Sequence, residues 1–380
     1  MKMMNVKTES LPWSILLLSG LILLQQGCTK DGPEVSYATP EDCAYISAGG
    51  HHSLTLETNG TLWAWGSNAY GQLGDSTTVD ENIPVRIGNG YASISAGDNF
   101  SLALKTDSTL WAWGNNDFGQ LGDGSLSDRE SPALIGSDYV AIAAGYEHAL
   151  ALKSDYTLWA WGDNTHGQLG DGTNSDRNRP VQIGLSFVAI AAGGNHSIAL
   201  KSDGALWAWG DNTHGQLGDS SVTYGNNKPA LIGSGFVSIA AGDNHTLALK
   251  SDGTLWGWGR NNYGQVGNNS STDVRVPVEI GFGYNAINAG TFFSIALKED
   301  NTLWAWGDNA YFGHLGDGSS TNHKIPVKII SGYTRLAAGH FHALALRTDG
   351  TLWAWGSNAN GQLGDGTNVD RNSPVRIGPE

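Results

Sequence analysis

The stretch GDNTHGQLGDGT, residues 162–173, looks at first like a ligand site. Glycines separated by four residues open a phosphate-binding loop, and Asp163, His166 and Asp171 are residue types that bind metals. The chain holds seven copies of this pattern: GSNAYGQLGD, GNNDFGQLGD, GDNTHGQLGD twice, GRNNYGQVGN, GDNAYFGHLGD and GSNANGQLGD. Because a catalytic centre is usually made once, a pattern made seven times is typical of a scaffold.

Two tryptophans separated by one residue precede every copy. Successive copies lie 48 or 49 residues apart, and a fixed period of this length indicates a repeat architecture. These positions hold fourteen of the fifteen tryptophans, all except Trp13. The pairs are Trp63/Trp65, Trp111/Trp113, Trp159/Trp161, Trp207/Trp209, Trp256/Trp258, Trp304/Trp306 and Trp353/Trp355.

One repeat predicts four short antiparallel strands and no helix. In VAIAAGGNHSIALKSDGALWAWG, residues 188–210, an apolar run ends at glycine and HSIALK alternates apolar with small or polar residues. Asp203-Gly204 then supplies a tight hairpin turn, and the proline-led strand RPVQIG closes the unit at an outer edge. At three turns the glycine is replaced, and there we expect positive φ on Ser108, Tyr156 and Asn301.

Four-stranded units stacked radially are the blades of a propeller. We therefore predict an all-β fold, a seven-bladed β-propeller of four-stranded antiparallel blades over residues 45–380. Each buried tryptophan removes about 150–250 Å² from water, so the tryptophan pair is expected to be the main adhesive between blades.

The repeat IAAGxxHSLALxxDGxLWAWGxNxxGQLGDG is similar to that of the regulator of chromosome condensation family. The similarity covers all seven copies and nearly the whole chain after its N-terminal segment. It implies a seven-bladed propeller. For function it implies less, since family members include exchange factors for small GTPases, a secreted inhibitor of β-lactamases and many bacterial proteins with no assigned role.

The first residues predict export. Lys2 and Lys7 precede an apolar run, Leu11–Leu24, that is shorter than the roughly 20 residues of a membrane span. The following QQGC resembles a bacterial lipobox, although Gln25 stands where leucine is usual. We expect a lipoprotein signal peptide over residues 1–27, a lipidated Cys28 and a polar tether over 28–44. Ordinary secretion and a cytoplasmic protein are the alternatives, and without acylation a Cys28–Cys43 disulfide is conceivable.

Charge and composition narrow the partners. The net charge is −15 without a basic stripe, so nucleic acid is not an expected partner and a membrane is expected only through the lipid anchor. A protein partner should be neutral or basic, and the chain itself is expected to be a monomer.

The opening stretch lacks the residues that a ligand would need. Gln168 and Leu169 stand where a phosphate loop has lysine and serine or threonine, and Thr165 breaks a calcium-loop pattern. The asparagine of each copy is expected to shape the turn. No cofactor and no catalytic residues are expected, and no metal.

Histidine follows AGxx in five repeats, a pattern that could suggest a metal. Phe100 and Phe293 take the same place in the other two repeats, and a phenyl ring cannot bind a metal. We therefore expect these histidines to be packed, hydrogen-bonded strand residues. They are His52, His148, His196, His245 and His342.

The residue before GQLG varies between copies and should circle one face of the propeller. Six of the seven are ring-bearing, which suits protein recognition; the alternative is that each ring packs over its own turn. These residues are Tyr70, Phe118, His166, His214, Tyr263, Phe312 and Asn360. We predict a non-enzymatic protein-binding scaffold at the cell envelope, on the outer membrane or cell surface, or otherwise secreted. A guanine-nucleotide exchange factor, implied by the resemblance, and a secreted hydrolase inhibitor are the alternatives.

Overall fold

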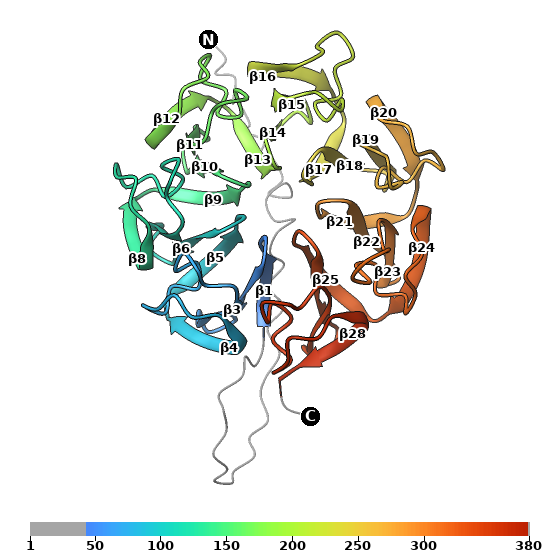
Figure 1. The fold of residues 1–380 in the computed structure, drawn as a ribbon. Coiled ribbons are helices and arrows are strands. Elements are labelled where there is room, and N and C mark those ends of the chain that lie inside the picture. Colours follow the sequence, from blue (N-terminus) through green and yellow to red (C-terminus); the bar gives the residue numbers. More distant parts are fainter. Residues whose placement is uncertain (1–42, 379–380) are drawn as a thin grey trace, which may run out of the picture. The chain divides into compact units, whose positions relative to one another are not determined.

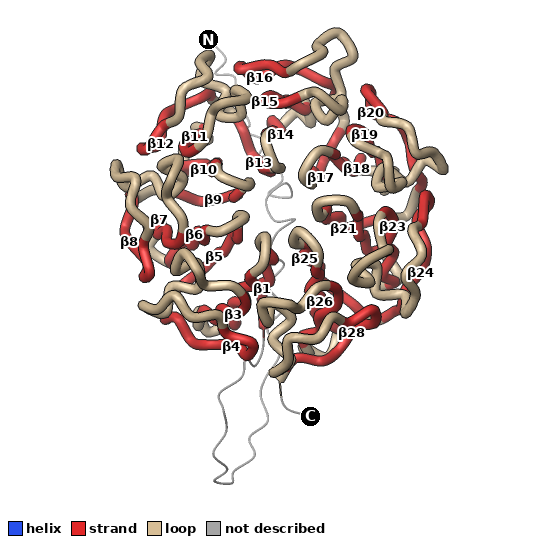
Figure 2. Tube along the Cα trace, in the orientation of Figure 1, coloured by secondary structure: helices blue, strands red, loops and turns tan. Residues whose placement is uncertain are grey.

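The computed structural model describes residues 43–378, so the predicted signal peptide, Cys28 and the tether up to residue 42 lie outside the described residues. Seven four-stranded antiparallel sheets stand around a central axis, which confirms the predicted seven-bladed β-propeller (Figure 1). Over the same residues the chain forms strands, turns and loops but no helix (Figure 2).

Each blade contains four strands that are consecutive in the sequence and in the sheet. The innermost strands are β1 (Cys43–Ala48), β5 (Tyr91–Ala96), β9 (Tyr139–Ala144), β13 (Phe187–Ala192), β17 (Phe236–Ala241), β21 (Tyr284–Ala289) and β25 (Tyr333–Ala338). The second strands are β2 (His52–Glu57), β6 (Phe100–Lys105), β10 (His148–Lys153), β14 (His196–Lys201), β18 (His245–Lys250), β22 (Phe293–Lys298) and β26 (His342–Arg347). The third strands are β3 (Leu62–Gly66), β7 (Leu110–Gly114), β11 (Leu158–Gly162), β15 (Leu206–Asp211), β19 (Leu255–Gly259), β23 (Thr302–Gly307) and β27 (Leu352–Gly356). The outer strands are β4 (Glu81–Gly88), β8 (Arg129–Gly136), β12 (Arg177–Gly184), β16 (Gly225–Gly233), β20 (Val274–Gly281), β24 (His323–Ser331) and β28 (Arg371–Ile377).

Two local predictions about the strands are confirmed. The strands that contain the prolines are the outer edges, where a residue without an N–H leaves no ladder bond unmade. Each of these strands, however, begins three or four residues before its proline rather than at it. The three hairpin turns without glycine do carry positive φ, at 63° for Ser108, 65° for Tyr156 and 60° for Asn301. The inner strand β1 begins at Cys43, two residues before the expected start, because Cys43 pairs with Glu57 of β2.

The GQLG segment fastens each blade to the next. In the third blade, the carbonyl of Gln168 accepts hydrogen bonds from Trp209 Nε1 at 2.8 Å and from the Ser197 hydroxyl at 2.8 Å, both in the fourth blade. Trp209 is fully buried, and it packs against Leu150 of the third blade. The second glycine, Gly170, leaves room for this indole, because a Cβ there would lie 2.7 Å from Trp209 Nε1. The motif of residues 162–173 is therefore part of the scaffold.

Gly170→Ala should separate this steric role from backbone strain. Gly170 has φ +80° and would press a Cβ against Trp209, whereas Gly235 has φ +81° with nothing within 4 Å of its Cβ position. We expect Gly235→Ala to cost about 1 kcal/mol through φ alone, and Gly170→Ala to cost at least about 1 kcal/mol more through overpacking. Urea unfolding followed by tryptophan fluorescence measures both variants, and equal losses would show that the indole does not need this space.

The two tryptophans of a pair are not equivalent, contrary to the prediction that both are main adhesives. Trp209 is fully buried between blades, but Trp207 is only half-buried, beside the ammonium of Lys201, 5.0 Å from the ring centroid. In most repeats a threonine hydroxyl accepts from the first indole, as Thr157 does from Trp159 at 2.8 Å. The first tryptophan thus packs against the cluster between the blades but remains partly exposed.

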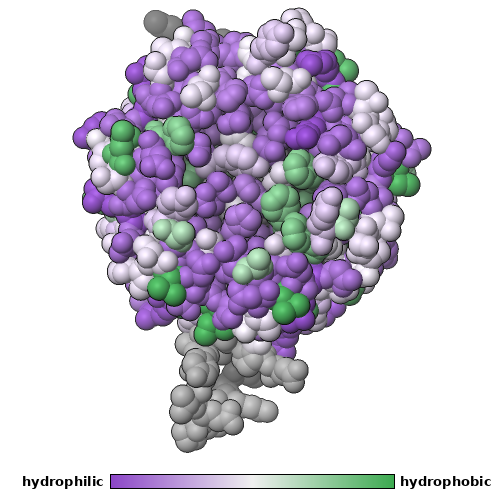
Figure 3. Space-filling model, in the orientation of Figure 1, coloured by the Kyte–Doolittle hydropathy of each residue, from purple (hydrophilic) through white to green (hydrophobic). Residues whose placement is uncertain are grey.

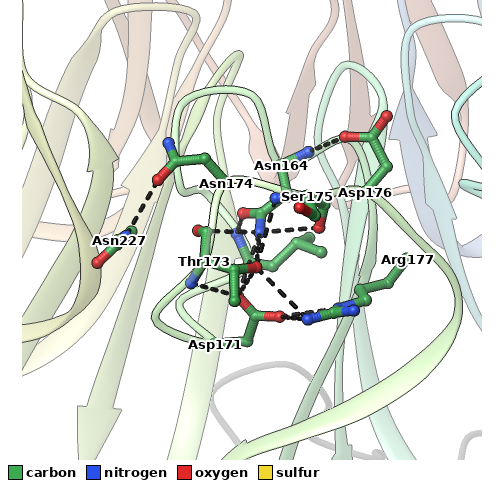
Figure 4. A network of polar contacts seen from close by, with 9 residues as sticks. Asn164, Asp171, Thr173, Asn174, Ser175, Asp176, Arg177 and Asn227 are labelled. Atoms are coloured by element: carbon green, nitrogen blue, oxygen red, sulfur yellow. Dashed lines mark hydrogen bonds and ion pairs between the residues drawn. The ribbon is translucent and has the colours of Figure 1, made fainter.

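The asparagine that recurs in each copy stabilises its loop, as expected. Asn164 Oδ1 accepts from the backbone N–H of Leu169 at 3.0 Å, and Asn164 Nδ2 donates to Asp171 at 3.2 Å (Figure 4). Asp171 in turn pairs with Arg177 at 2.6 Å. Asp171, one of the apparent metal ligands, is therefore used within the loop.

The histidines also join neighbouring blades. His148 Nε2 lies 3.0 Å from the hydroxyl of Ser197 in the next blade. Because that hydroxyl already donates to Gln168, His148 must donate through Nε2–H. His52–Ser101, His196–Thr246, His245–Ser294 and His342–Ser53 repeat the arrangement at 2.8–3.0 Å. The expectation of packed, hydrogen-bonded histidines is confirmed.

The two phenylalanines at the histidine position come with a matched partner. Phe100 packs with Ala149 in the next blade, and Phe293 packs with Ala343. The chain therefore uses two interchangeable joints between blades: a hydrogen-bonded histidine–hydroxyl joint and an apolar phenylalanine–alanine joint.

The ring closes between the first and last blades without exchanging a strand. Strand β1 packs against β25 and β26 (Figure 1). Ser53 bonds His342 at 2.9 Å and the Gln362 carbonyl at 2.7 Å, which also accepts from Trp65 at 2.9 Å. The closing joint uses the same contacts as the others.

Candidate protein-binding face

Two sets of loops meet on one face of the propeller, which we call the loop face. One set is the turns between the first and second strands, and the other is the segments between the third and outer strands. Backbone hydrogen bonds join them, as from Asp308 N to the Phe292 carbonyl at 2.9 Å and from Ser357 N to the Phe341 carbonyl at 2.7 Å. Each of these bonds joins the two loops of one blade, so residues of the two sets lie side by side.

The variable positions of these loops form three rings around the axis. The inner ring consists of Gly50, Asp98, Tyr146, Gly194, Asp243, Thr291 and His340, which line the mouth of the central channel. The second ring consists of His51, Asn99, Glu147, Asn195, Asn244, Phe292 and Phe341. The outer ring consists of the residues that precede GQLG.

The outer ring carries the predicted partner-binding residues, and their surroundings differ. Tyr70 is 40% exposed, Phe118 is half-buried, and His166 is exposed beside its neighbour Thr165. His214 Nδ1 lies 2.7 Å from Asp273 of the next blade. Asn360 likewise donates to Asp80 at 3.1 Å. At those two positions the side chain contacts a neighbouring loop.

Tyr263 and Phe312 join a group of rings that the sequence did not reveal. Their ring centroids lie 5.1 Å from Phe292 and 5.8 Å from Phe341, respectively, and those two rings are 6.2 Å apart. We call Tyr263, Phe292, Phe312 and Phe341 the aromatic cluster. Hydrophobic residues gather to the right of the channel mouth, over the region between β17 and β25 (Figure 3). Tyr311, 78% exposed, lies next to Phe312.

A sequence signal for Phe292 and Phe341 did exist. Both precede the histidine or phenylalanine of the AGxx pattern, and the two residues written x change in nearly every copy. Variation at a structurally fixed position indicates a role outside the scaffold, and it distinguishes the second ring as well as the outer one.

Three carboxylates, from the second, third and fifth blades, lie at or beside the channel mouth. Burial, and then repulsion from Asp243, raises the pKa of Asp98 to about 6. Burial raises the pKa of Asp243 to about 6, and burial followed by repulsion from Asp163 and other carboxylates raises the pKa of Glu147 to about 7. We call Asp98, Glu147 and Asp243 the acidic sector.

Tyr146 reaches across the mouth of the channel. Its hydroxyl lies 3.2 Å from Thr291 Oγ1, and its ring centroid lies 4.4 Å from that of His340. His340 Nδ1 is 3.5 Å from Asp98, and burial lowers the pKa of His340 to about 3, so the imidazole is neutral at physiological pH. The remaining space at the mouth is about 70 Å³, a depression lined by the inner ring.

Among the described residues, no three histidine, cysteine, aspartate or glutamate side chains are arranged to hold a metal ion. The same residues contain no helix that is long and apolar enough to cross a membrane.

Comparison with known proteins decides the family. The RCC1-like domain profile matches residues 136–380, more than half of the chain. The chain belongs to the RCC1-like domain family. Regulator of chromosome condensation (RCC1) repeats match residues 59–104 and 107–152 of this RCC1-like propeller.

Solved RCC1-like structures resemble the chain over most of its length. Human WBSCR16 superposes with a TM-score of 0.76 at 24% identity, covering 84% of this chain and 94% of that one. Prp20p of Saccharomyces cerevisiae superposes with a TM-score of 0.72 at 26% identity, covering 78% and 80%. Human alsin is 40% identical over 72 residues, which are 18% of this chain and only 4% of alsin. The chain thus spans a small part of the length of alsin.

Proposed function

We propose that this RCC1-like propeller is a non-enzymatic protein-binding module displayed at the cell envelope, and that it holds a protein partner on its loop face. The aromatic cluster carries the proposal. Large rings held by a rigid scaffold lose little entropy on binding, and Phe and Tyr side chains serve as anchors at protein interfaces. An apolar group at the surface is also more typical of an interaction site than of a solvated face.

One similar protein supports binding as the mode of action. The structure of Prp20p was described together with its binding to Gsp1p and histones. Similarity to Prp20p is also the support for the alternative, a guanine-nucleotide exchange factor, and export would argue against it because GTP and its GTPases are cytoplasmic. Inhibition of a secreted hydrolase is a special case of protein binding.

The envelope location rests on the leader sequence. Labelled palmitate should enter the wild-type chain but not Cys28→Ala, because the thioether-forming cysteine is the acceptor. One chain contributes about 0.8 kcal/mol per buried methylene, and two or more chains give durable anchoring. Equal labelling of both proteins would contradict the location without bearing on the loop face.

Serine replacements in the aromatic cluster test the function. A partner isolated from envelope proteins should bind Phe292→Ser and Phe341→Ser about 1–3 kcal/mol more weakly than wild type, as expected for interface anchors. Phe282→Ser is the matched control, since Phe282 is 74% exposed but lies between outer strand β20 and inner strand β21, away from the loop face. Titration calorimetry measures the affinities and thermal melts check the fold. Unchanged affinity in both cluster variants would contradict the proposal.

A further inference from the structure

The aromatic cluster and the acidic sector border the same depression. Phe292 and Phe341 follow the inner-ring residues Thr291 and His340 directly. Thr291 contacts Tyr146 of the third blade at 3.2 Å, and His340 contacts Asp98 of the second blade at 3.5 Å. A ligand seated over the channel mouth would therefore meet both aromatic rings and carboxylates.

Among the described residues, the carboxylates of the acidic sector, Asp98, Glu147 and Asp243, have no lysine or arginine within ion-pair distance. The charge of Arg260 acts on Asp243 without forming an ion pair, and its guanidinium lies over the Phe292 ring, 5.0 Å from the centroid. Elsewhere on this loop face, aspartates do have such partners, for example Asp171 with Arg177 and Asp365 with Arg371, both at 2.6 Å.

We propose that the channel mouth binds a segment of the partner protein in which an apolar side chain lies a few residues from a lysine or arginine. The apolar side chain packs on Phe292, Phe312 and Phe341, and the cation lies against Asp98, Glu147 and Asp243. This inference rests on the proposed protein-binding function and specifies its partner.

The charges of the acidic sector favour a basic and apolar segment over other ligands. A buried carboxylate that repels its neighbours gains more from an incoming cation than an exposed and paired one does, because the interaction is less screened. A second copy of this chain, with a net charge of −15, would bring carboxylates of the same sign to the site. An acidic segment would meet the same repulsion, whereas a basic and apolar one satisfies both sectors.

Three fluorescein-labelled dodecapeptides test the proposal by fluorescence anisotropy at pH 7.5. The first carries two leucines and two lysines in a glycine–serine background, made in both orders. The second replaces lysine with glutamate, and the third replaces leucine with serine. We expect saturable binding of a leucine–lysine peptide and at least tenfold weaker binding of the other two.

Variants of the full chain locate the site. Phe292→Ser/Phe341→Ser and Asp98→Asn/Asp243→Asn should each weaken binding of the leucine–lysine peptide at least tenfold, and Glu147→Gln should weaken it by a smaller factor. The matched controls are Phe282→Ser and Glu279→Gln, which change an exposed phenylalanine and an exposed glutamate away from the loop face. Melting curves identify any variant that does not fold, and Glu147→Gln then supplies the charge test.

Each contrary outcome would refute a specific part of the proposal. Equal binding of the leucine–glutamate peptide would refute the role of the acidic sector. Equal binding of the lysine–serine peptide would show only general attraction to an acidic protein. If no peptide binds, the proposed segment is wrong, whereas the protein-binding function fails only if the isolated partner ignores the aromatic cluster.

Discussion

Trp209→Ala is expected to lower the free energy of unfolding by about 3–5 kcal/mol. The indole is fully buried at the joint between the third and fourth blades, and its removal leaves a cavity that rigid strands cannot fill. The Gln168 carbonyl also loses one of its two donors. Because every blade depends on the next, the loss should appear as a lower urea midpoint of the whole propeller.

Trp207→Ala is the matched control on the same strand. Trp207 is half-buried and its Nε1 has no hydrogen-bond partner, so its removal should cost clearly less, about 1–2 kcal/mol. A loss below 1 kcal/mol for Trp209→Ala, or equal losses for the two variants, would show that the second tryptophan is not the joint between blades.

The propeller is expected to lose stability as the pH falls from 6.5 towards 4. Burial lowers the pKa of His52, His148 and His245 to about 3 and that of His196 to about 4. These imidazoles stay neutral in the folded chain but take up protons below pH 6.5 when it unfolds. Their contribution is therefore complete above pH 6.5 and is lost as the pH falls, by about 2 kcal/mol each at pH 5.

The acidic sector works in the opposite direction with smaller shifts. The raised pKa values of Asp98, Asp243 and Glu147 mean that the folded chain binds protons more tightly than the unfolded chain between about pH 7 and 4. Protonation there relieves repulsion and adds stability as the pH falls. Below pH 5 the buried histidines outweigh these three carboxyls.

Replacing one histidine–hydroxyl joint with a phenylalanine–alanine joint isolates the effect of the histidine on the pH dependence of stability. His148→Phe/Ser197→Ala copies the Phe100–Ala149 joint, so we expect little change in urea midpoint at pH 7.5. Between pH 7.5 and 5 the variant should lose about 2 kcal/mol less than wild type does, because one proton-binding group of the unfolded chain is gone. An unchanged pH dependence would show that His148 is not held neutral by burial.

Much of the scaffold could be predicted because it is written seven times. The period of 48 or 49 residues, the alternation in HSIALK and the turn at Asp203-Gly204 each predict a blade, and the structure agrees. The pairing of His148 with Ser197 could also be inferred from the two repeats in which phenylalanine faces alanine. The repeats do not indicate how far apart residues of different blades lie in the folded chain.

The aromatic cluster illustrates that limit. Tyr263, Phe292, Phe312 and Phe341 come from three consecutive blades, and only the stacking of neighbouring blades brings them together. The outer-ring residues looked equivalent in sequence, but His214 bonds Asp273 while Phe312 packs on Phe341. The raised pKa values of the acidic sector depend likewise on burial at the channel mouth, which no local pattern encodes.

Site-specific photo-cross-linking tests the central claim most directly, that the loop face holds the partner. A benzophenone amino acid replaces Tyr263 in the aromatic cluster in one protein, and in another it replaces Tyr156, 50% exposed in the β10–β11 hairpin turn on the opposite side. We expect a covalent adduct with the envelope partner from position 263 and none from position 156. An adduct from position 156 alone would contradict the central claim.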